Sequence, residues 1–217
     1  MYRFNLGKPR LLKSPTKQQL EKVFQLRNSF PHFREVIERV HTSLHAKMLS
    51  GAPTKFPNIL LVAGPGVGKT HFCSALAAAL EIEKHEVSSS TSDPILLCGL
   101  SPPYKAARPG KIAQALAICL FFIDEIHKAG MPGRSDNGNT TSFCDQLLPA
   151  LESGTQMFND SDFGEKAGIH VGMCSWIMAA NDLSLLPGYF VSRLNVYHIK
   201  NPGSEDLKAG LLKSIFE

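Results

Sequence analysis

The pattern of apolar positions divides the chain into an N-terminal helical stretch and a longer region that alternates short apolar runs with helical segments. Two helices are predicted before residue 57: KQQLEKVFQLRNSF, capped by Thr16, and HFREVIERVHTSLHAKML. Each has apolar residues three or four positions apart, which gives it one face for burial. The apolar runs that follow lack polar alternation and are NILLVA (58–63), HEVS (85–88), CLFFI (119–123), CSWIMAA (174–180) and NVYHI (195–199).

Apolar runs separated by helices are typical of parallel strands that are covered on both faces. Further helices are predicted near 69–83, 111–117 and 142–152. The sequence therefore predicts an α/β three-layer domain with a parallel five-stranded sheet. The segments 129–141 and 153–172 are rich in Gly, Ser, Asn and Asp, and we expect both to be long loops.

Length and composition limit the protein to a few classes. A chain of 217 residues with 43% hydrophobic residues fits one globular domain, and its net charge of +4 does not suggest a dedicated nucleic-acid binder. The five cysteines form no CxxC pair and the eight histidines form no HExxH motif, so neither a zinc site nor a disulfide framework is indicated. The N-terminus lacks an apolar signal stretch and no apolar run is long enough to span a bilayer. We therefore expect a cytoplasmic protein with no membrane segment.

A glycine-rich loop, AGPGVGKT (63–70), joins the first predicted strand to a helix and satisfies the Walker A pattern, except that Ala63 replaces the first glycine. Glycines at three positions let consecutive N–H groups converge on a phosphate, and the helix adds its positive N-terminal end. Lys69 is expected to reach the β- and γ-phosphates and Thr70 to ligate Mg²⁺. The alternative is a turn without a ligand. The expected ATP contacts are Gly64, Pro65, Gly66, Val67, Gly68, Lys69, Thr70 and His71.

A second motif, LFFIDEIHK (120–128), places two acids at the end of an apolar strand. If that strand lies near the glycine-rich loop, Asp124 is the expected Mg²⁺ partner and Glu125 the base that activates water. The alternative is a strand that ends in two solvated acids. The letters DEIH also occur in some helicases, but a helicase core needs two such domains and this length fits one. We expect His127 to be a partly exposed residue at the start of the next segment.

At this point the sequence resembles an AAA+ ATPase, closest to the ATPase module of Lon-type proteases. The resemblance runs from about Phe30 to Ile199. It is carried by the ordered set FPHFREVIERV, CGLSPPYKAARPGKIAQAL (98–116), FFIDEIHKA and WIMAANDLSLLPGYFVSRLNVYHI (176–199).

The resemblance implies further roles. Asn181 matches sensor 1, which holds the attacking water or the γ-phosphate; an Asn in an ordinary turn is the alternative. Arg193 matches the arginine finger that reaches a neighbouring subunit's nucleotide; an exposed arginine with a structural role is the alternative. By the same resemblance, residues 30–33 are expected to border the adenine. Tyr104 matches a pore-loop aromatic that grips a threaded polypeptide, although Lys105 and Ala106 depart from the family pattern and local packing is the alternative.

The family also implies an arrangement of the chain and a function. The expected parts are an arm or linker (1–16), an N-terminal helical segment (17–57), the AAA+ large subdomain (58–200) and the start of a truncated helical lid (201–217), with no room for a Lon-type protease domain. The expected function is Mg²⁺-dependent ATP hydrolysis that remodels or unfolds a protein substrate in a homo-oligomeric ring, a hexamer in the full-length protein. Two alternatives stay open: action on DNA or RNA, supported only by the basic arm, and a nucleotide-gated scaffold.

Overall fold

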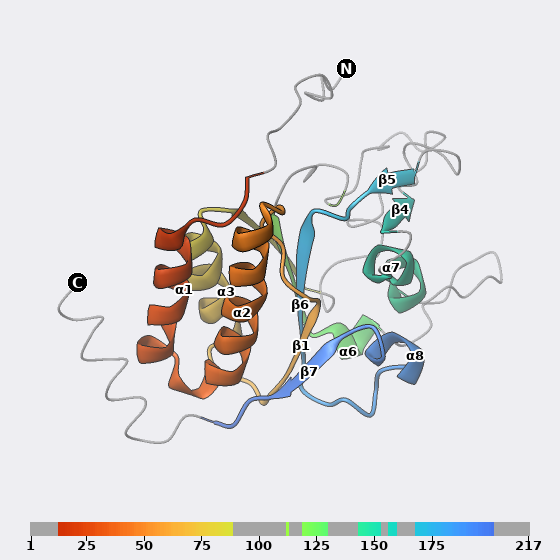
Figure 1. Ribbon diagram of the computed structural model, residues 1–217. Coiled ribbons are helices and arrows are strands. Elements are labelled where there is room, and N and C mark those ends of the chain that lie inside the picture. Colours follow the sequence, from red (N-terminus) through yellow and green to blue (C-terminus); the bar gives the residue numbers. More distant parts are fainter. Residues whose placement is uncertain are drawn as a thin grey trace, which may run out of the picture.

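The computed structural model describes residues 13–88, 112, 119–129, 143–152, 156–159 and 168–201. Its helices are α1 (Lys17–Ser29), the 3-10 turn η1 (Pro31–Phe33), α2 (Arg34–Ser50), α3 (Lys69–Leu80), α6 (Ile126–Ala129), α7 (Phe143–Leu151) and α8 (Gly188–Val191). Its strands are β1 (Ile59–Val62), β2 (Glu83–Ser88), β3 (Cys119–Asp124), β4 (Met157–Asn159), β5 (Gly168–His170), β6 (Cys174–Ala180) and β7 (Asn195–His198). Figure 1 shows their arrangement.

The main sheet has five strands in the order β2-β3-β6-β1-β7, and every neighbouring pair is parallel. This confirms the predicted parallel five-stranded sheet, and each predicted run overlaps one of its strands, although β2 begins two residues earlier and β3 ends one residue later than predicted. β6 occupies the centre of the sheet, and all seven of its residues are buried. Such burial explains why CSWIMAA shows no polar alternation.

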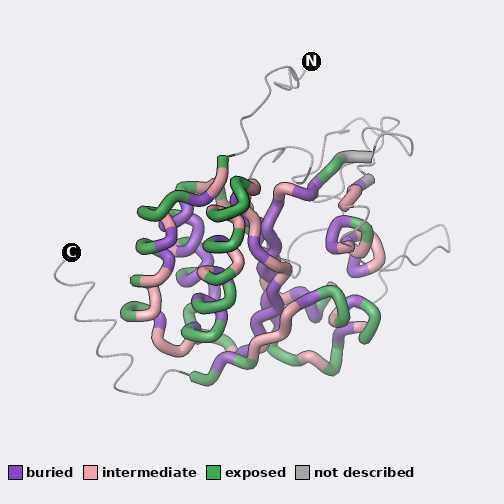
Figure 2. The backbone as a smooth tube through the Cα atoms, in the orientation of Figure 1, coloured by how far each residue is buried: buried purple, intermediate pink, exposed green. Residues whose placement is uncertain are grey.

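Alternate residues of the strands supply two separate cores, one on each face of the sheet. Ile59 and Leu61 face the helices α1, α2 and α3, whereas Leu60 faces the other side together with Trp176 and residues of α7. Figure 1 shows α1–α3 on one side of the sheet and α6–α8 on the other. Figure 2 shows buried residues along the sheet and exposed residues on the outer faces of α1 and α2. The architecture is the predicted three-layer α/β fold.

The N-terminal helical stretch also forms as predicted. Thr16 caps α1, and α2 ends at Gly51, whose φ of 66° is the left-handed conformation that favours glycine at a helix C-terminus. The second helix differs in one detail, because it starts as a 3-10 turn at Pro31–Phe33. The N–H groups at the start of a helix have no partner within the helix, so proline, which has no N–H, is well suited to the first position. In the described residues, no helix combines the length and the apolar character needed to cross a membrane.

The prediction of a long loop at 153–172 was wrong in part, because the segment contains two short strands. The segment 153–172 contains the strands β4 and β5, which pair antiparallel through Met157↔His170 and Asn159↔Gly168. Three-residue strands are too short to give a period-2 signal, so the sequence pattern does not reveal them. The helices α6 and α8 were also missed, because four residues are too few to show a helical period. The predicted helix at 111–117 lies outside the described residues except for Ile112, which is helical.

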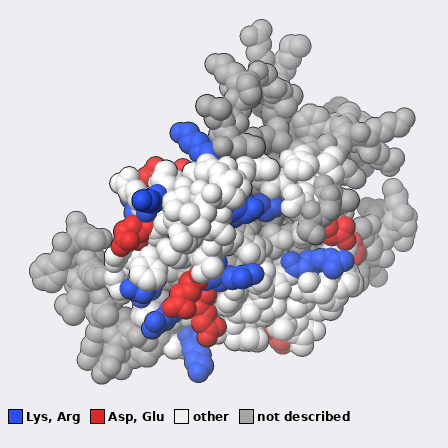
Figure 3. Space-filling view, in the orientation of Figure 1, with Lys and Arg blue, Asp and Glu red and all other residues white. Residues whose placement is uncertain are grey.

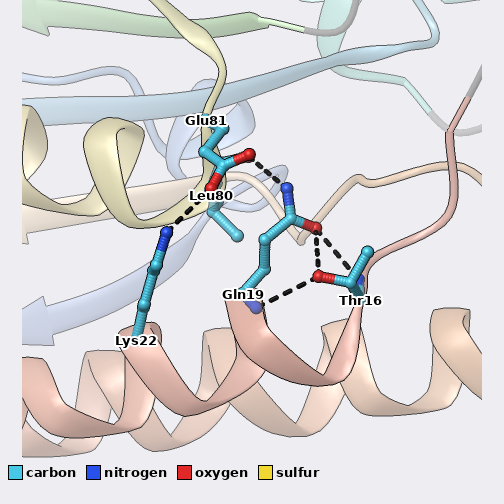
Figure 4. Close-up of polar contacts among 5 residues, drawn as sticks. All are labelled: Thr16, Gln19, Lys22, Leu80 and Glu81. Carbon is cyan, nitrogen blue, oxygen red and sulfur yellow. Dashed lines mark hydrogen bonds and ion pairs between the residues drawn. The ribbon is translucent and has the colours of Figure 1, made fainter.

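Gln19 connects the start of α1 to the end of α3 (Figure 4). Its side-chain Oε1 accepts a hydrogen bond from the backbone N–H of Thr16 at 2.9 Å. The backbone N–H of Gln19 donates to Thr16 Oγ1 at 3.2 Å, which completes a capping box. Its Nε2 donates to the carbonyl of Leu80 at 2.7 Å, on the last residue of α3. Nearby, Lys22 and Glu81 form an exposed ion pair at 2.8 Å.

We expect Gln19→Ala to lower the free energy of unfolding by about 1–2 kcal/mol, because it removes a helix cap and leaves the Leu80 carbonyl without its partner. The measurement is urea denaturation followed by circular dichroism. Lys22→Ala is the matched control one turn along α1: it removes only an exposed ion pair and should leave the midpoint unchanged. Equal midpoints for the two variants would contradict a structural role for Gln19.

Candidate functional site

Three strands bring polar residues to one edge of the sheet. Val62 of β1 pairs with Ala180 of β6, and Ile123 of β3 pairs with Met178 of β6, so the carboxyl ends of all three strands lie together. β1 and β3 are not adjacent, because β6 lies between them. The residue that follows β6 therefore lies between the glycine-rich loop after β1 and the acids at the end of β3. In open parallel sheets, this edge is where ligands bind.

The glycine-rich loop has a conformation that requires glycine at two positions. Gly66 has a φ of 78° and Gly68 a φ of 89°, both in the left-handed region, and Gly68 directly precedes the first turn of α3. The loop begins at Ala63, whose N–H donates to the carbonyl of Ala180 at 3.0 Å and so continues the pairing of β1 with β6. Ala63 is buried, so a small residue fits where the pattern usually has glycine.

Lys69 points back across this loop and is only 8% exposed. Its Nζ donates to the carbonyl of Ala63 at 2.8 Å, to the carbonyl of Gly64 at 3.0 Å and to Oδ1 of Asn181 at 3.2 Å. Burial lowers the pKa of the Lys69 ammonium, and the nearby carboxylates of Asp124 and Glu125 oppose that shift. The loop lysine, the residue after β6 and the two acids thus share one electrostatic environment.

The two acids adopt a defined local geometry. Asp124 Oδ1 accepts a hydrogen bond from the N–H of Glu125 at 2.8 Å. Glu125 has a φ of 55°, which is uncommon for a residue other than glycine, and its Oε1 forms an ion pair with Lys128 Nζ at 2.6 Å. The turn sets the carboxylate of Glu125 at the start of α6, one residue after the strand ends. Unusual backbone conformations of this kind concentrate at functional sites.

His127 is buried, which corrects the expectation of a partly exposed residue. It is 7% exposed, and its Nδ1 accepts a hydrogen bond from the N–H of Asn181 at 3.4 Å. This contact ties α6 to the end of β6 and thereby supports the residue that reaches Lys69. The sequence pattern did not predict the role, because the contact spans 54 residues and depends on the strand order.

Residues 30–33 lie against the glycine-rich loop and the first turns of α3. The ring of Phe30 lies 5.3 Å from that of His71, and Phe33 stacks on Phe72 with centroids 4.3 Å apart and planes 7° apart. His32 Nε2 is 3.0 Å from the carbonyl oxygen of Val67. Sequence reasoning expected this segment near the adenine but did not identify the contact between His32 and the loop.

One predicted site residue, Arg193, is not brought to this cluster. Arg193 follows α8, is exposed, and forms an ion pair with Glu152 at 3.6 Å. In Figure 1, α8 lies with α7 on the side of the sheet opposite α1–α3. Tyr104 lies outside the described residues, as does the predicted lid beyond Asn201.

A divalent cation would find hard oxygen donors at this edge. Within the part of the chain that the structure describes, no three His, Cys, Asp or Glu side chains form a metal-binding group by themselves. Mg²⁺ in nucleotide sites is held by one or two protein oxygens, with phosphates and water completing the shell. The hydroxyl of Thr70, in the first turn of α3, and the carboxylate of Asp124 are donors of that kind.

The fold and this edge define a class of protein: a parallel α/β protein with a glycine-rich loop after β1, a buried loop lysine and two acids where β3 ends, with β6 between the two strands. The family described as "ATPase family associated with various cellular activities (AAA)" matches residues 59–200. That range is more than half of the chain. The chain therefore belongs to the AAA family of ATPases, a class that binds nucleotide and hydrolyses ATP.

The chain is also similar to the ATPase region of several Lon proteases. Lon protease 2 of Herpetosiphon aurantiacus is 33% identical over 51% of this chain and 14% of its own length. The Lon protease of Bacillus thuringiensis is 29% identical over 76% of this chain and 20% of its own length. The mitochondrial Lon protease homolog of Schizosaccharomyces pombe is 30% identical over 64% and 13%. The chain thus spans a fifth or less of these relatives, and the similarity confirms the resemblance to Lon-type AAA+ modules.

Proposed function

We propose that this chain is a Mg²⁺-dependent ATPase module whose nucleotide site is the edge formed by the loop at 63–70, Asp124, Glu125 and Asn181. The observation that carries the proposal is the hydrogen bond between Lys69 Nζ and Asn181 Oδ1, at 3.2 Å. It joins the loop to the residue after β6, and the acids at the end of β3 act on the same ammonium. A γ-phosphate placed at this ammonium would therefore be close to the residues that this chain contributes to its own site.

Each residue then has a distinct chemical task. The N–H groups of the Walker A loop and the N-terminus of α3 bind the phosphates, with Lys69 at the β- and γ-phosphates. Thr70 of α3 and Asp124 at the end of β3 would hold Mg²⁺, which supplies charge neutralisation when it is bound. Glu125 orients and deprotonates the attacking water, and Asn181 positions that water or the γ-phosphate. Residues Gly64, Pro65, Gly66, Val67, Gly68 and His71 complete the nucleotide contacts.

Arg193 supports the proposal that hydrolysis depends on assembly. Arg193 follows α8, its side chain is 47% exposed, and Glu152 lies 3.6 Å from it, so a neighbouring molecule has access to the guanidinium. An arginine that reaches a neighbour's γ-phosphate stabilises the charge of the transition state. We therefore propose a homo-oligomeric ring of the AAA+ type. The similarity to Lon proteases supports a protein substrate, with Tyr104 as a pore-loop contact.

Action on a nucleic acid is the weaker candidate. Most of the basic arm lies outside the described residues. Figure 3 shows lysine and arginine side chains interspersed with acidic ones on the visible face rather than gathered in one basic stripe. Nucleic-acid binders instead concentrate positive charge along the path of the phosphate backbone.

Mixing two inactive variants tests whether Arg193 acts between subunits. Arg193→Ala keeps its own Glu125 but lacks the finger, whereas Glu125→Gln keeps the finger but lacks the base. In a ring, each site meets the finger of one neighbour, so an equal mixture should recover roughly a quarter of the wild-type ATPase rate. The measurement is phosphate release after the two proteins have exchanged subunits.

The control for this experiment is the double variant Arg193→Ala/Glu125→Gln mixed with either single variant. Neither mixture contains a site that combines an intact base with a neighbouring finger, so both should stay at the level of the single variants. A mixture of the two single variants that stays equally inactive would rule out the role of Arg193 in trans.

A further inference from the structure

His32 makes a side-chain contact with the backbone of the phosphate loop. Its Nε2 lies 3.0 Å from the carbonyl oxygen of Val67, although the two residues are 35 positions apart. A carbonyl oxygen can only accept a hydrogen bond, so Nε2 is the nitrogen that donates its proton in this contact. Nδ1 is buried and has no hydrogen-bond partner among the described residues. The imidazole therefore acts here as a donor through Nε2.

The surroundings of His32 fix the direction of this hydrogen bond. Its ring lies 4.6 Å from the ring of Phe33, and Phe33 in turn stacks on Phe72 of α3. Phe33 and Phe72 are fully buried, so the imidazole lies against the close-packed core. The 3-10 turn η1 and the first turns of α3 are thus joined by an aromatic stack as well as by a hydrogen bond.

The carbonyl that His32 contacts belongs to the peptide group between Val67 and Gly68. In the proposed function, the N–H of that peptide group faces the nucleotide. The C=O of Val67 and the N–H of Gly68 lie in one planar trans peptide and point in opposite directions. A donor that holds the carbonyl on one side therefore aims the Gly68 N–H to the other side. The Gly68 φ of 89° leaves this peptide easy to rotate, because glycine also populates other regions.

We propose that His32 is a positioning residue for phosphate binding: its Nε2–H fixes the Val67–Gly68 peptide so that the Gly68 N–H is aimed at a nucleotide phosphate. The hydrogen bond to the carbonyl also polarises the peptide, which strengthens the N–H as a donor. This inference rests on the proposed function of the loop at 63–70. It extends that function to a residue of the N-terminal helical segment.

Two substitutions that differ by one methylene group separate this role from a general effect on the fold. In His32→Gln the amide nitrogen takes the place of Nε2 and can still donate to Val67, whereas in His32→Asn it takes the place of Nδ1 and cannot. We expect His32→Asn to bind ATP about 3- to 10-fold more weakly than the wild type, the effect of one lost hydrogen bond, and His32→Gln to stay within about 2-fold. The measurement is titration calorimetry with ATP and Mg²⁺ on the full chain.

Inorganic tripolyphosphate is the probe that tests the mechanism. Because the Gly68 N–H binds phosphate and not the base, His32→Asn should lose affinity for tripolyphosphate and for ATP by the same factor. Equal affinity of the Asn and Gln variants for ATP would overturn the proposal. So would a loss restricted to ATP with tripolyphosphate unaffected, since His32 would then act on the base.

Lys69→Ala distinguishes failure of this inference from failure of the proposed function. If Lys69→Ala loses ATP binding while His32→Asn and His32→Gln bind equally well, only the role of His32 is wrong. If the wild-type chain and Lys69→Ala bind ATP and tripolyphosphate alike, the loop is not the phosphate site and both proposals fall. Denaturation midpoints measured without nucleotide show whether each variant is folded. If His32 served only stability, the midpoints of both variants would shift, but their ATP affinities would not differ from each other.

Discussion

We expect the Lys69→Ala variant to bind ATP about 10- to 150-fold more weakly than the wild-type chain, which corresponds to about 1.5–3 kcal/mol for a hydrogen bond to a charged group. The Lys69 ammonium is buried beside the glycine-rich loop and within hydrogen-bonding distance of Asn181. Alanine removes the positive charge that would meet the β- and γ-phosphates. The measurement is titration calorimetry or the displacement of a fluorescent ATP analogue.

Lys55→Ala is the matched control, because Lys55 is a second partly buried lysine that donates to a backbone carbonyl. Its Nζ bonds to the carbonyl of Gly172 at 2.7 Å, and burial lowers its pKa as it does for Lys69. Lys55 precedes β1 and Gly172 precedes β6, so the contact lies at the opposite edge of the sheet. The control should retain wild-type ATP affinity. Undiminished affinity in Lys69→Ala would refute the assignment of the loop.

The second large effect concerns turnover rather than binding. We expect Glu125→Gln to lower kcat for ATP hydrolysis by roughly 10²- to 10⁴-fold, the contribution of a general base, while ATP affinity changes little. Glutamine keeps the size of the side chain and can occupy the same turn after Asp124. It cannot accept the proton of the attacking water. Phosphate release at saturating ATP measures the rate, and equilibrium titration measures the affinity.

Glu81→Gln is the control for this variant, because the two glutamates share their local features. Both have a φ of 55°, and both form an ion pair with a lysine, Glu81 with Lys22 and Glu125 with Lys128. Glu81 lies after α3, away from the edge that carries the loop. Loss of turnover in both variants would point to the shared backbone or charge effect, and wild-type turnover in Glu125→Gln would remove its catalytic role.

Much of the fold could be predicted from the sequence because each part had a strong local signal. The runs that became β1, β3 and β6 are almost wholly apolar and are buried in the middle of the sheet, and the loop glycines marked the passage from β1 to α3. The sheet order was not predictable in this way. Placement of β6 between β1 and β3 depends on packing between residues more than 50 positions apart, and no local pattern encodes it.

The site shows the same division between local and distant information. The motifs predicted Lys69, Asp124 and Glu125 as chemistry-bearing residues, and the strand order explains how Asn181 reaches Lys69. His127 and His32 carried no such signal, because a single histidine beside an apolar residue is a common pattern. Their contacts with Asn181 and Val67 became visible only in three dimensions.

The left-handed backbone at Glu125 carries a consequence for engineering. A residue with a side chain costs roughly 1–2 kcal/mol in that conformation, whereas glycine does not. Replacing Glu125 by glycine would therefore remove this strain and raise the free energy of unfolding. Screens that reward heat resistance alone would favour glycine or asparagine there and would enrich variants that have lost the carboxylate. A thermostabilised version of this protein should therefore be selected on turnover and melting temperature together, with residue 125 held fixed.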